Sequence, residues 1–236
     1  MEEMIIHSEL VHPNIIQFLG VAVGRTNVGW LPTGFVLESF PEGSLHNMLR
    51  TEREVLPYGF RLEVALQFAR SLAYLHGKKI VHFDIKPHNI LVRRNFDHVE
   101  DTVAKLIDFG FSLKMDGDWL DMSGRSTKRH VWGTRKYAAP ELFVDVKNVT
   151  EKADVFSFGV TLWKMFTRQS PRNGLSKEGI MQRWINGTMP ELRIPSSCER
   201  EWAELIRDCT KITATDRPSM DTVVRRISVA KSMTSA

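Results

Sequence analysis

The chain has few cysteines and no long hydrophobic run. Its 236 residues include two cysteines, Cys198 and Cys209, whose number and spacing fit neither a disulfide framework nor a zinc site. No stretch of about 18 apolar residues occurs that would cross a membrane. The N-terminus also lacks the charged-then-apolar pattern of a signal peptide. We therefore expect a cytoplasmic protein with no membrane segment in this chain, so that any membrane attachment would come from a segment upstream of it.

The chain also lacks a strong net charge. Lys and Arg number 32 against 28 Asp and Glu, a formal net charge of +4, and no stripe of basic and aromatic residues accompanies it. Binding to nucleic acid is therefore not expected. Hydrophobic residues make up 42% of the chain, enough to bury a core in one or two compact units. The sequence leaves the oligomeric state open.

The first forty residues predict a helix followed by a β-hairpin. Residues 1–11 are expected to form a helix that stops before Pro13, because a proline disfavours helix in the residue before it. Residues 15–23 and 34–40 are apolar and rich in β-branched or aromatic side chains, which is typical of strands. The turn residues of 24–29 lie between them, so we expect a hairpin.

Beyond a linker rich in turn-forming residues at 39–43, helical periodicity takes over. Apolar residues recur at three- and four-residue steps from Leu62 to His76, which predicts one helix face. A hairpin is expected near residues 93–103. Further helices are expected at 153–167, 177–186, 199–209 and 220–230.

Three short strings occur in a fixed order in the middle of the chain. Residues 80–92 read IVHFDIKPHNILV, residues 108–110 read DFG and residues 139–141 read APE. Together they supply two carboxylates, a lysine and an asparagine, a set that can handle a metal-bound triphosphate. The D-x-K-x-x-N string, followed by the other two, resembles the catalytic core of eukaryotic protein kinases. The resemblance runs from about residue 3 to residue 229.

The resemblance implies an α+β, protein-kinase-like fold. Residues 1–38 would form an incomplete, small, β-rich N-lobe with its first helix and a β-hairpin. Residues 39–43 would be the hinge, and residues 44–236 the larger, mainly helical C-lobe.

Four residues are candidates for the chemistry. Asp84 would orient the substrate hydroxyl and accept its proton, and Lys86 would neutralise the phosphoryl group in transit. Asn89 and Asp108 would supply neutral and charged oxygen ligands, a hard set suited to Mg²⁺ rather than zinc. Taken singly, the two aspartates could cap turns and the lysine could be a solvated surface charge. Their joint occurrence with the downstream strings favours the catalytic interpretation.

Other residues would position this set. By resemblance, His82 would stack on Phe109, and Asp154 would hold backbone amides of the catalytic loop. Glu141 and Arg217 would form a buried, structural ion pair. Taken alone, His82 is a core histidine and Asp154 an ordinary acid at a helix N-terminus.

The resemblance also implies ATP. Leu37 would lie at the back of the adenine pocket, Glu38 and Phe40 would offer backbone groups, and Leu91 would form the apolar floor. The three apolar residues would serve equally well as plain core.

Two short strings indicate which type of residue accepts the phosphoryl group. Lys86-Pro87, and Gly133-Thr134 ahead of Tyr137, resemble serine/threonine kinases, and Thr134 would hydrogen-bond near Asp84 and Lys86. The sequence as a whole is similar to the sequences of the tyrosine-kinase-like group, whose members mostly modify serine and threonine. We therefore expect protein substrates phosphorylated on these residues.

The chain departs from the pattern in two places. Phe83 replaces the arginine that usually precedes the catalytic aspartate and pairs with a phosphate on the activation segment, which argues against that route of activation. Ser123, Ser126 and Thr127 lie in a basic stretch that could be phosphorylated or could be a solvated loop. In addition, Glu3 lies where the first helix usually carries a glutamate that pairs with a strand lysine.

No such lysine precedes Glu3, and no G-x-G-x-x-G string occurs, so an N-terminally truncated domain is expected, with an exposed sheet edge. His7 also replaces an apolar residue of the internal stack. Three hypotheses follow: a serine/threonine protein kinase domain using ATP and Mg²⁺, a catalytically inactive pseudokinase or scaffold fragment, and a small-molecule phosphotransferase. The four intact candidates favour the first, and the APE string weighs against the third.

Overall fold

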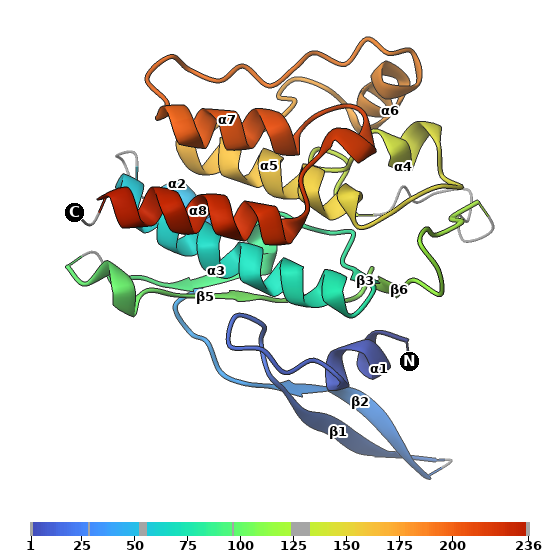
Figure 1. Ribbon diagram of the computed structural model, residues 1–236. Coiled ribbons are helices and arrows are strands. Elements are labelled where there is room, and N and C mark those ends of the chain that lie inside the picture. Colours follow the sequence, from blue (N-terminus) through green and yellow to red (C-terminus); the bar gives the residue numbers. More distant parts are fainter. Residues whose placement is uncertain (1, 28, 52–55, 96, 124–132, 235–236) are drawn as a thin grey trace.

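Figure 1 shows the computed structural model, which describes residues 2–27, 29–51, 56–95, 97–123 and 133–234. Most helices stack together in the larger part of the molecule. A smaller part, made of α1 (Glu2–Ser8), β1 (Phe18–Thr26) and β2 (Gly29–Leu37), lies along one side of that stack, at the bottom of the view. The predicted α+β organisation is confirmed. The predicted hinge, 39–43, falls between β2 and α2 (Leu45–Thr51), although the lobe boundaries stay a prediction.

The hairpin is present, but its predicted turn is wrong. β1 and β2 pair antiparallel as far as Thr26 and Gly29, so the residues assigned to the turn largely belong to the strands. Glycine need not end a strand, and two register shifts, at Phe18/Gly20 and Ala22/Val23, absorb the irregularity as β-bulges do. The first helix is also shorter than predicted and ends at Ser8.

The hairpin is the least covered part of the described chain. All nine residues of β2 are exposed, including Trp30, which is 68% exposed, and Phe35 and Leu37. Among the residues that the structure describes, no third strand joins this sheet, so both strands have an edge without a strand partner there.

Two helices form the centre of the larger part. α3 (Tyr58–Gly77) buries the predicted apolar face, and α5 (Lys152–Thr167) is buried from Ala153 to Phe166. Figure 1 shows α5 between α7 (Arg200–Cys209) and the pair of α3 and α8 (Met220–Thr234). Because α5 is enclosed, each polar group on it needs a partner inside the protein.

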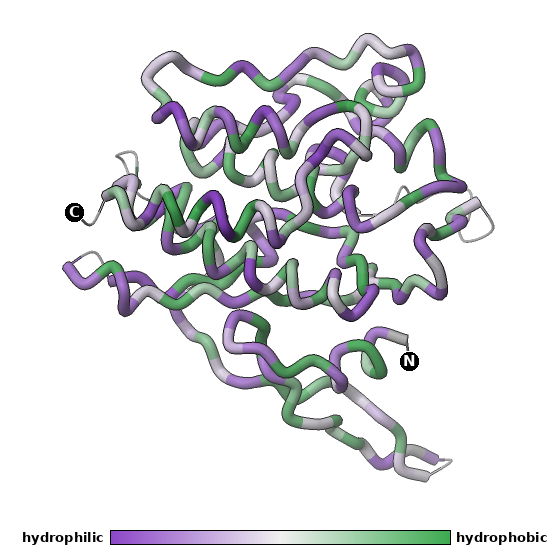
Figure 2. Tube along the Cα trace, in the orientation of Figure 1, coloured by the Kyte–Doolittle hydropathy of each residue, from purple (hydrophilic) through white to green (hydrophobic). Residues whose placement is uncertain are grey.

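The helices α5, α6 (Lys177–Ile185), α7 and α8 follow the predicted ranges closely, although α8 runs on to Thr234. The short helix α4 (Glu141–Val144) was not predicted. Along α7 and α8 hydrophilic and hydrophobic residues alternate from turn to turn (Figure 2), as expected for helices with one buried face. In the part of the chain that the structure describes, no helix combines the length and apolar character needed to cross a membrane.

Two short antiparallel sheets frame the motif strings. β3 (Ile80–Val81) pairs with β6 (Leu113–Lys114), and β4 (Ile90–Arg93) pairs with β5 (Val103–Leu106). Residues 82–89 therefore form the loop from β3 to β4, and residues 107–112 the loop from β5 to β6. The two pairings bring these loops together, which is how residues distant in sequence reach one site.

Candidate active site

Three of the predicted polar side chains meet directly in the loop after β3. The Lys86 ammonium donates to Oδ2 of Asp84 and, over 3.0 Å, to the hydroxyl of Thr134. The Thr134 hydroxyl donates in turn to Oδ1 of Asp84 over 2.7 Å. Asp84 is almost fully buried. Each oxygen of the carboxylate thus has a donor, and the three groups have fixed relative positions.

These contacts decide the protonation of Asp84. Burial alone would raise the pKa of this carboxyl group, but the hydrogen bonds from Lys86 and Thr134 outweigh it and hold the pKa below its ordinary value. Asp84 is therefore ionised at neutral pH and can accept a proton.

Asn89 is oriented by the same carboxylate. Its Nδ2 donates to the backbone oxygen of Asp84 over 2.9 Å and to Oδ2 over 3.0 Å. Since the amide hydrogens are used here, the Oδ1 atom points elsewhere and remains an acceptor. The Asn89 carbonyl also accepts from the Ile107 N–H over 3.0 Å, which places Asn89 beside the residue that precedes Asp108.

Asp108 is exposed, with a left-handed φ of 68°, a conformation that aspartate tolerates better than most residues. Its Oδ1 accepts from the Gly110 N–H over 3.3 Å. The side chain of Glu3 also reaches this loop, because a Cβ built on Gly110 would lie 3.6 Å from Glu3 Oε2. The loop thus presents the side-chain oxygens of Asp108 to solvent while Phe109 is fully buried.

The oxygens of Asn89 and Asp108 fit a magnesium ion. Mg²⁺ is usually held by one or two carboxylates together with substrate phosphates and water, and not by a complete protein cage. Consistent with that chemistry, the described residues contain no group of three or more His, Cys, Asp or Glu side chains placed to hold a metal.

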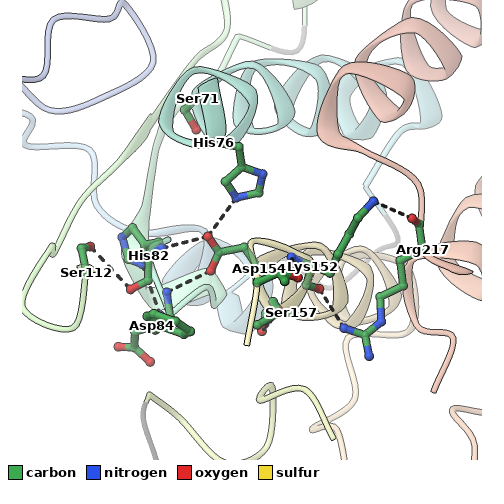
Figure 3. A network of polar contacts seen from close by, with 12 residues as sticks. Ser71, His76, His82, Asp84, Ser112, Lys152, Asp154, Ser157 and Arg217 are labelled. Carbon is green, nitrogen blue, oxygen red and sulfur yellow. Dashed lines mark hydrogen bonds and ion pairs between the residues drawn. The ribbon is translucent and has the colours of Figure 1, made fainter. Parts of the chain in front are cut away.

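A buried carboxylate accepts hydrogen bonds from the backbone of the catalytic loop. Figure 3 shows Asp154, at the start of α5, accepting from the backbone N–H groups of His82 and Phe83 over 2.8 and 2.9 Å. The ring of His76 also contacts Asp154 over 3.0 Å. The side chain of Asp154 is fully buried. The two backbone contacts are those predicted from the resemblance, whereas the contact with His76 was not predicted.

The segment that carries Thr134 is locked to the same loop by a glycine. Phe83 has a left-handed φ of 64° and Gly133 one of 74°. A Cβ on Gly133 would lie 2.0 Å from the Phe83 carbonyl oxygen, far closer than any side chain can be. Glycine is therefore required at this position, and the close approach aligns Thr134 with Asp84.

Three aromatic rings join the loop to the smaller part of the molecule. His82 stacks near Phe109 with ring centroids 5.2 Å apart, and Phe109 lies 4.6 Å from His7. Burial lowers the pKa of His82. His7 is buried as well, and its Nε2 lies 2.8 Å from the Ile16 carbonyl oxygen. That hydrogen bond explains how the polar side chain noted in the sequence is accommodated in an apolar stack.

The predicted ion pair between Glu141 and Arg217 is formed. The guanidinium donates to the two carboxylate oxygens over 2.6 and 2.8 Å. Three backbone carbonyl groups, of Lys152, Lys211 and Ile212, accept its remaining hydrogens. Figure 3 shows Arg217 beside Lys152 at the start of α5. A buried pair with this many bonds is expected to be structural.

Of the proposed nucleotide contacts, Leu37 lies exposed at the end of β2. The carboxylate of Glu38 accepts from Lys105 over 2.6 Å and from the Gln17 N–H over 2.7 Å. These contacts leave the backbone carbonyl of Glu38 for the role proposed from the sequence.

Phe40 lies beside the strand that carries Leu91. The Arg93 guanidinium sits 5.8 Å from the centre of the Phe40 ring, and Leu91 is half-buried on the same strand, β4. Phe40 therefore lies beside the strand that carries the proposed pocket floor. The role of these residues in binding adenine stays a prediction.

Sequence reasoning missed three residues beside the site. His88 lies inside the motif string and stacks on His46 of α2, and Lys164 lies buried on α5. In the sequence, the one feature that pointed to any of these three residues was the charge of Lys164 within a mostly apolar helix. Of the predicted modification sites, Ser126 and Thr127 lie outside the described residues, whereas Ser123 hydrogen-bonds to Asp121.

Comparisons with known proteins agree with this geometry. A family model described as protein tyrosine and serine/threonine kinase matches residues 1–227. The chain is 32% identical over 233 residues to the probable serine/threonine-protein kinase pats1 of Dictyostelium discoideum, covering 96% of this chain and 7% of that protein. It is 32% identical over 224 residues to mitogen-activated protein kinase kinase kinase 12 of Rattus norvegicus, covering 94% and 23%.

A third relative is the putative mitogen-activated protein kinase kinase kinase 7-like of Drosophila melanogaster. It is 36% identical over 223 residues, which cover 90% of this chain and 51% of that protein. The chain therefore spans from less than a tenth to about half of the length of these relatives.

Proposed function

Since this chain belongs to the protein tyrosine and serine/threonine kinase family, we propose that it is a serine/threonine protein kinase domain that transfers the γ-phosphoryl group of ATP to protein substrates. The hydrogen-bonded set of Asp84, Lys86 and Thr134 carries the proposal. It combines an ionised proton acceptor, a cation and a neutral hydroxyl in fixed positions.

In the reaction, a substrate serine or threonine oxygen forms a bond to the γ-phosphorus as the bond from that phosphorus to the β,γ-bridging oxygen breaks. The hydroxyl proton passes to Asp84, and ADP leaves with the bridging oxygen. Asp84 suits this role because its pKa is held low by hydrogen bonds. Its main contribution is to orient the hydroxyl, since such transition states need little covalent help.

Lys86 would neutralise charge on the phosphoryl group in transit. The oxygens of Asn89 and Asp108 would hold Mg²⁺, which when bound offsets negative charge on the phosphates. Because Asn89 is fixed by two hydrogen bonds to Asp84, the proposed metal ligand and the proposed proton acceptor have a set relative position. That pre-organisation is what the reaction requires.

Leu37, Leu91 and the backbone groups of Glu38 and Phe40 would contact the adenine ring. Serine and threonine are favoured as acceptors because Thr134 binds Asp84 directly and because one relative, pats1, is named a probable serine/threonine-protein kinase. The two free thiols, Cys198 and Cys209, are consistent with a cytoplasmic location.

Nucleotide binding can be tested by thermal unfolding with and without millimolar Mg-ATP. A ligand at about 100 times its dissociation constant stabilises the native state by about 2.7 kcal/mol. For a chain of this size the midpoint should rise by about 5–10 °C. Asp108→Asn should abolish the magnesium-dependent part of the rise. A chain that shows no rise does not hold the nucleotide by itself.

Phosphate transfer needs a separate test with a generic serine-rich protein as acceptor. Asp84→Asn keeps the shape of the side chain but removes the proton acceptor, and should lower kcat by about 100-fold or more. If transfer is absent and Asp84→Asn changes nothing that can be measured, the chain is a binding scaffold and the proposal is wrong.

A further inference from the structure

Two imidazole rings stack beside the catalytic loop. His46 lies on α2, and His88 lies four residues after Asp84, in the turn that leads into β4. Their ring centroids are 3.6 Å apart and the ring planes differ by 19°. Nδ1 of His46 is buried and finds no hydrogen-bond partner among the residues that the structure describes. The stack therefore contains a buried ring nitrogen that makes no hydrogen bond within the described residues.

A buried lysine lies next to the stack. Lys164 is on α5 and is 8% exposed. One turn further on, Arg168 donates to the Leu49 carbonyl over 2.7 Å, which joins the end of α5 to α2. Within the described ranges the Lys164 ammonium has no carboxylate partner and no hydrogen bond. The Lys164 nitrogen is not among the fully buried polar atoms without a partner, so the side chain is mostly buried while its ammonium reaches solvent, where a ligand can meet it.

The surroundings of these residues are cationic. Burial, followed by repulsion from His88, Lys164 and Arg50, lowers the pKa of His46 to about 4.

Lys164 itself is affected in the same way. Burial and the charge of Lys136 lower its pKa. Lys136 donates to the hydroxyl of Ser170 over 3.1 Å and follows Thr134 by two residues. Four segments thus bring positive charge to one place beside Asp84, whose own carboxylate is already bound by Lys86 and Thr134.

An anionic group would resolve these features together. It would give Lys164 a counter-charge, provide an acceptor for imidazole N–H groups, and reduce the repulsion between the cations. The site lies on the loop that would orient the acceptor hydroxyl, so the anion that reaches it most readily is part of the substrate chain. Resting on the kinase function proposed above, we propose that His46, His88 and Lys164 form a subsite for an acidic side chain of the protein substrate, close in sequence to the phosphorylated residue.

The test uses a set of serine-containing peptides with otherwise neutral flanks. One flanking position after another is replaced by Asp, by phosphoserine or by Arg. Each peptide is assayed as a substrate, with kcat and KM determined separately, and its binding is measured by fluorescence anisotropy in the absence of ATP. We expect Asp at one particular position to lower KM about tenfold, a typical gain for a charge-assisted hydrogen bond. Phosphoserine at that position should act at least as strongly.

Two variants probe the subsite and one serves as control. His88→Glu changes an exposed residue, so the protein should fold, and it should replace the preference for Asp by one for Arg. Lys164→Met keeps the length of the side chain but removes its charge, and should abolish the preference. Lys78→Glu makes a charge change at the exposed end of α3, and should leave the preference intact. Lys78→Glu should also leave kcat for the neutral peptide within about twofold of the unmodified chain, whereas the effect of the two subsite variants should fall mainly on KM for the Asp peptide.

The outcomes separate this proposal from the kinase proposal. If no peptide is phosphorylated, the kinase function fails, and the anisotropy measurements still decide whether the subsite exists. The subsite is overturned if Asp, phosphoserine and Ala bind alike at each position. It is also overturned if His88→Glu and Lys164→Met keep the same preference as the unmodified chain.

Discussion

Two buried charges stand ten residues apart on α5, and their surroundings differ. Asp154 is fully buried and accepts from two backbone N–H groups and from His76. Lys164 is nearly as buried, but no acceptor for its ammonium lies within the described residues. The Asp154 carboxylate is fully occupied by the hydrogen bonds that hold the catalytic loop. The second remains available, and a charge that a fold leaves available beside a reactive group is best explained by what binds there.

Removing the carboxylate of Asp154, the charge that has hydrogen-bond partners, should have the largest effect on stability. Asp154→Ala would leave two backbone N–H groups and an imidazole without an acceptor, which should cost about 4 kcal/mol of unfolding free energy. Urea denaturation followed by tryptophan fluorescence measures this loss. Asp154→Asn keeps one acceptor oxygen and should lose less. If Asp154→Ala is as stable as the unmodified chain, the carboxylate does not anchor the loop.

The second buried anion near α5 offers an independent check. Arg217→Met should destabilise the protein by about 3 kcal/mol, because it leaves Glu141 buried without its partner. The double variant Glu141→Gln/Arg217→Met should recover part of that loss, since no unpaired charge remains. Additive losses in the double-mutant cycle would show that the two side chains do not interact energetically.

At the other end of α5, removal of the Lys164 charge should not destabilise the protein, in contrast to removal of the Asp154 charge. Lys164→Met removes a charge that no described residue compensates, so stability should be unchanged or increase by up to about 1 kcal/mol. The same denaturation experiment measures it. A loss of more than about 1 kcal/mol would mean that the ammonium is satisfied in the protein alone, and would weaken the case for an acidic ligand.

The smallest expected effect is a change in protonation. His46 has a folded pKa of about 4, below its unfolded value, so the unfolded chain takes up the proton first and stability falls as pH drops below about 6.5. In Lys164→Met, one repelling cation is gone and the pKa of His46 should rise by a fraction of a pH unit. NMR titration of the ring carbon resonance measures the rise. Lys78→Glu should leave it unchanged, and a pKa that stays constant in Lys164→Met would show that the two groups are not coupled.

The sequence predicted the helices and the loop-holding carboxylate because their causes are local or carried by a motif. The periodicity from Leu62 to His76 follows from one buried helix face, and the structure shows α3 there. Asp154 was predicted from its place in a recognised string. The turn at 24–29 was predicted too long, because Gly24 and Gly29 pair across the hairpin as strand residues and only that pairing decides where the strands end.

The subsite around Lys164 could not be predicted in the same way. His46 and His88 are separated by the whole of α3, and only the packing of α2 on the catalytic loop stacks their rings. A lysine on a helix usually faces water, and the burial of Lys164 depends on α5 lying at the centre of the helical part. Information of this kind exists only once the helices are packed.

The contact between Gly133 and the Phe83 carbonyl has a practical consequence. With no room for even one methyl group, the two segments lie in direct contact, so the magnetic environment of the Gly133 amide depends on both at once. A single resonance in a ¹⁵N spectrum, well separated because glycine amides resonate apart from the rest, would then report whether the catalytic loop and the Thr134 segment are engaged. Nucleotide, peptide or variant effects on that engagement become measurable without an activity assay.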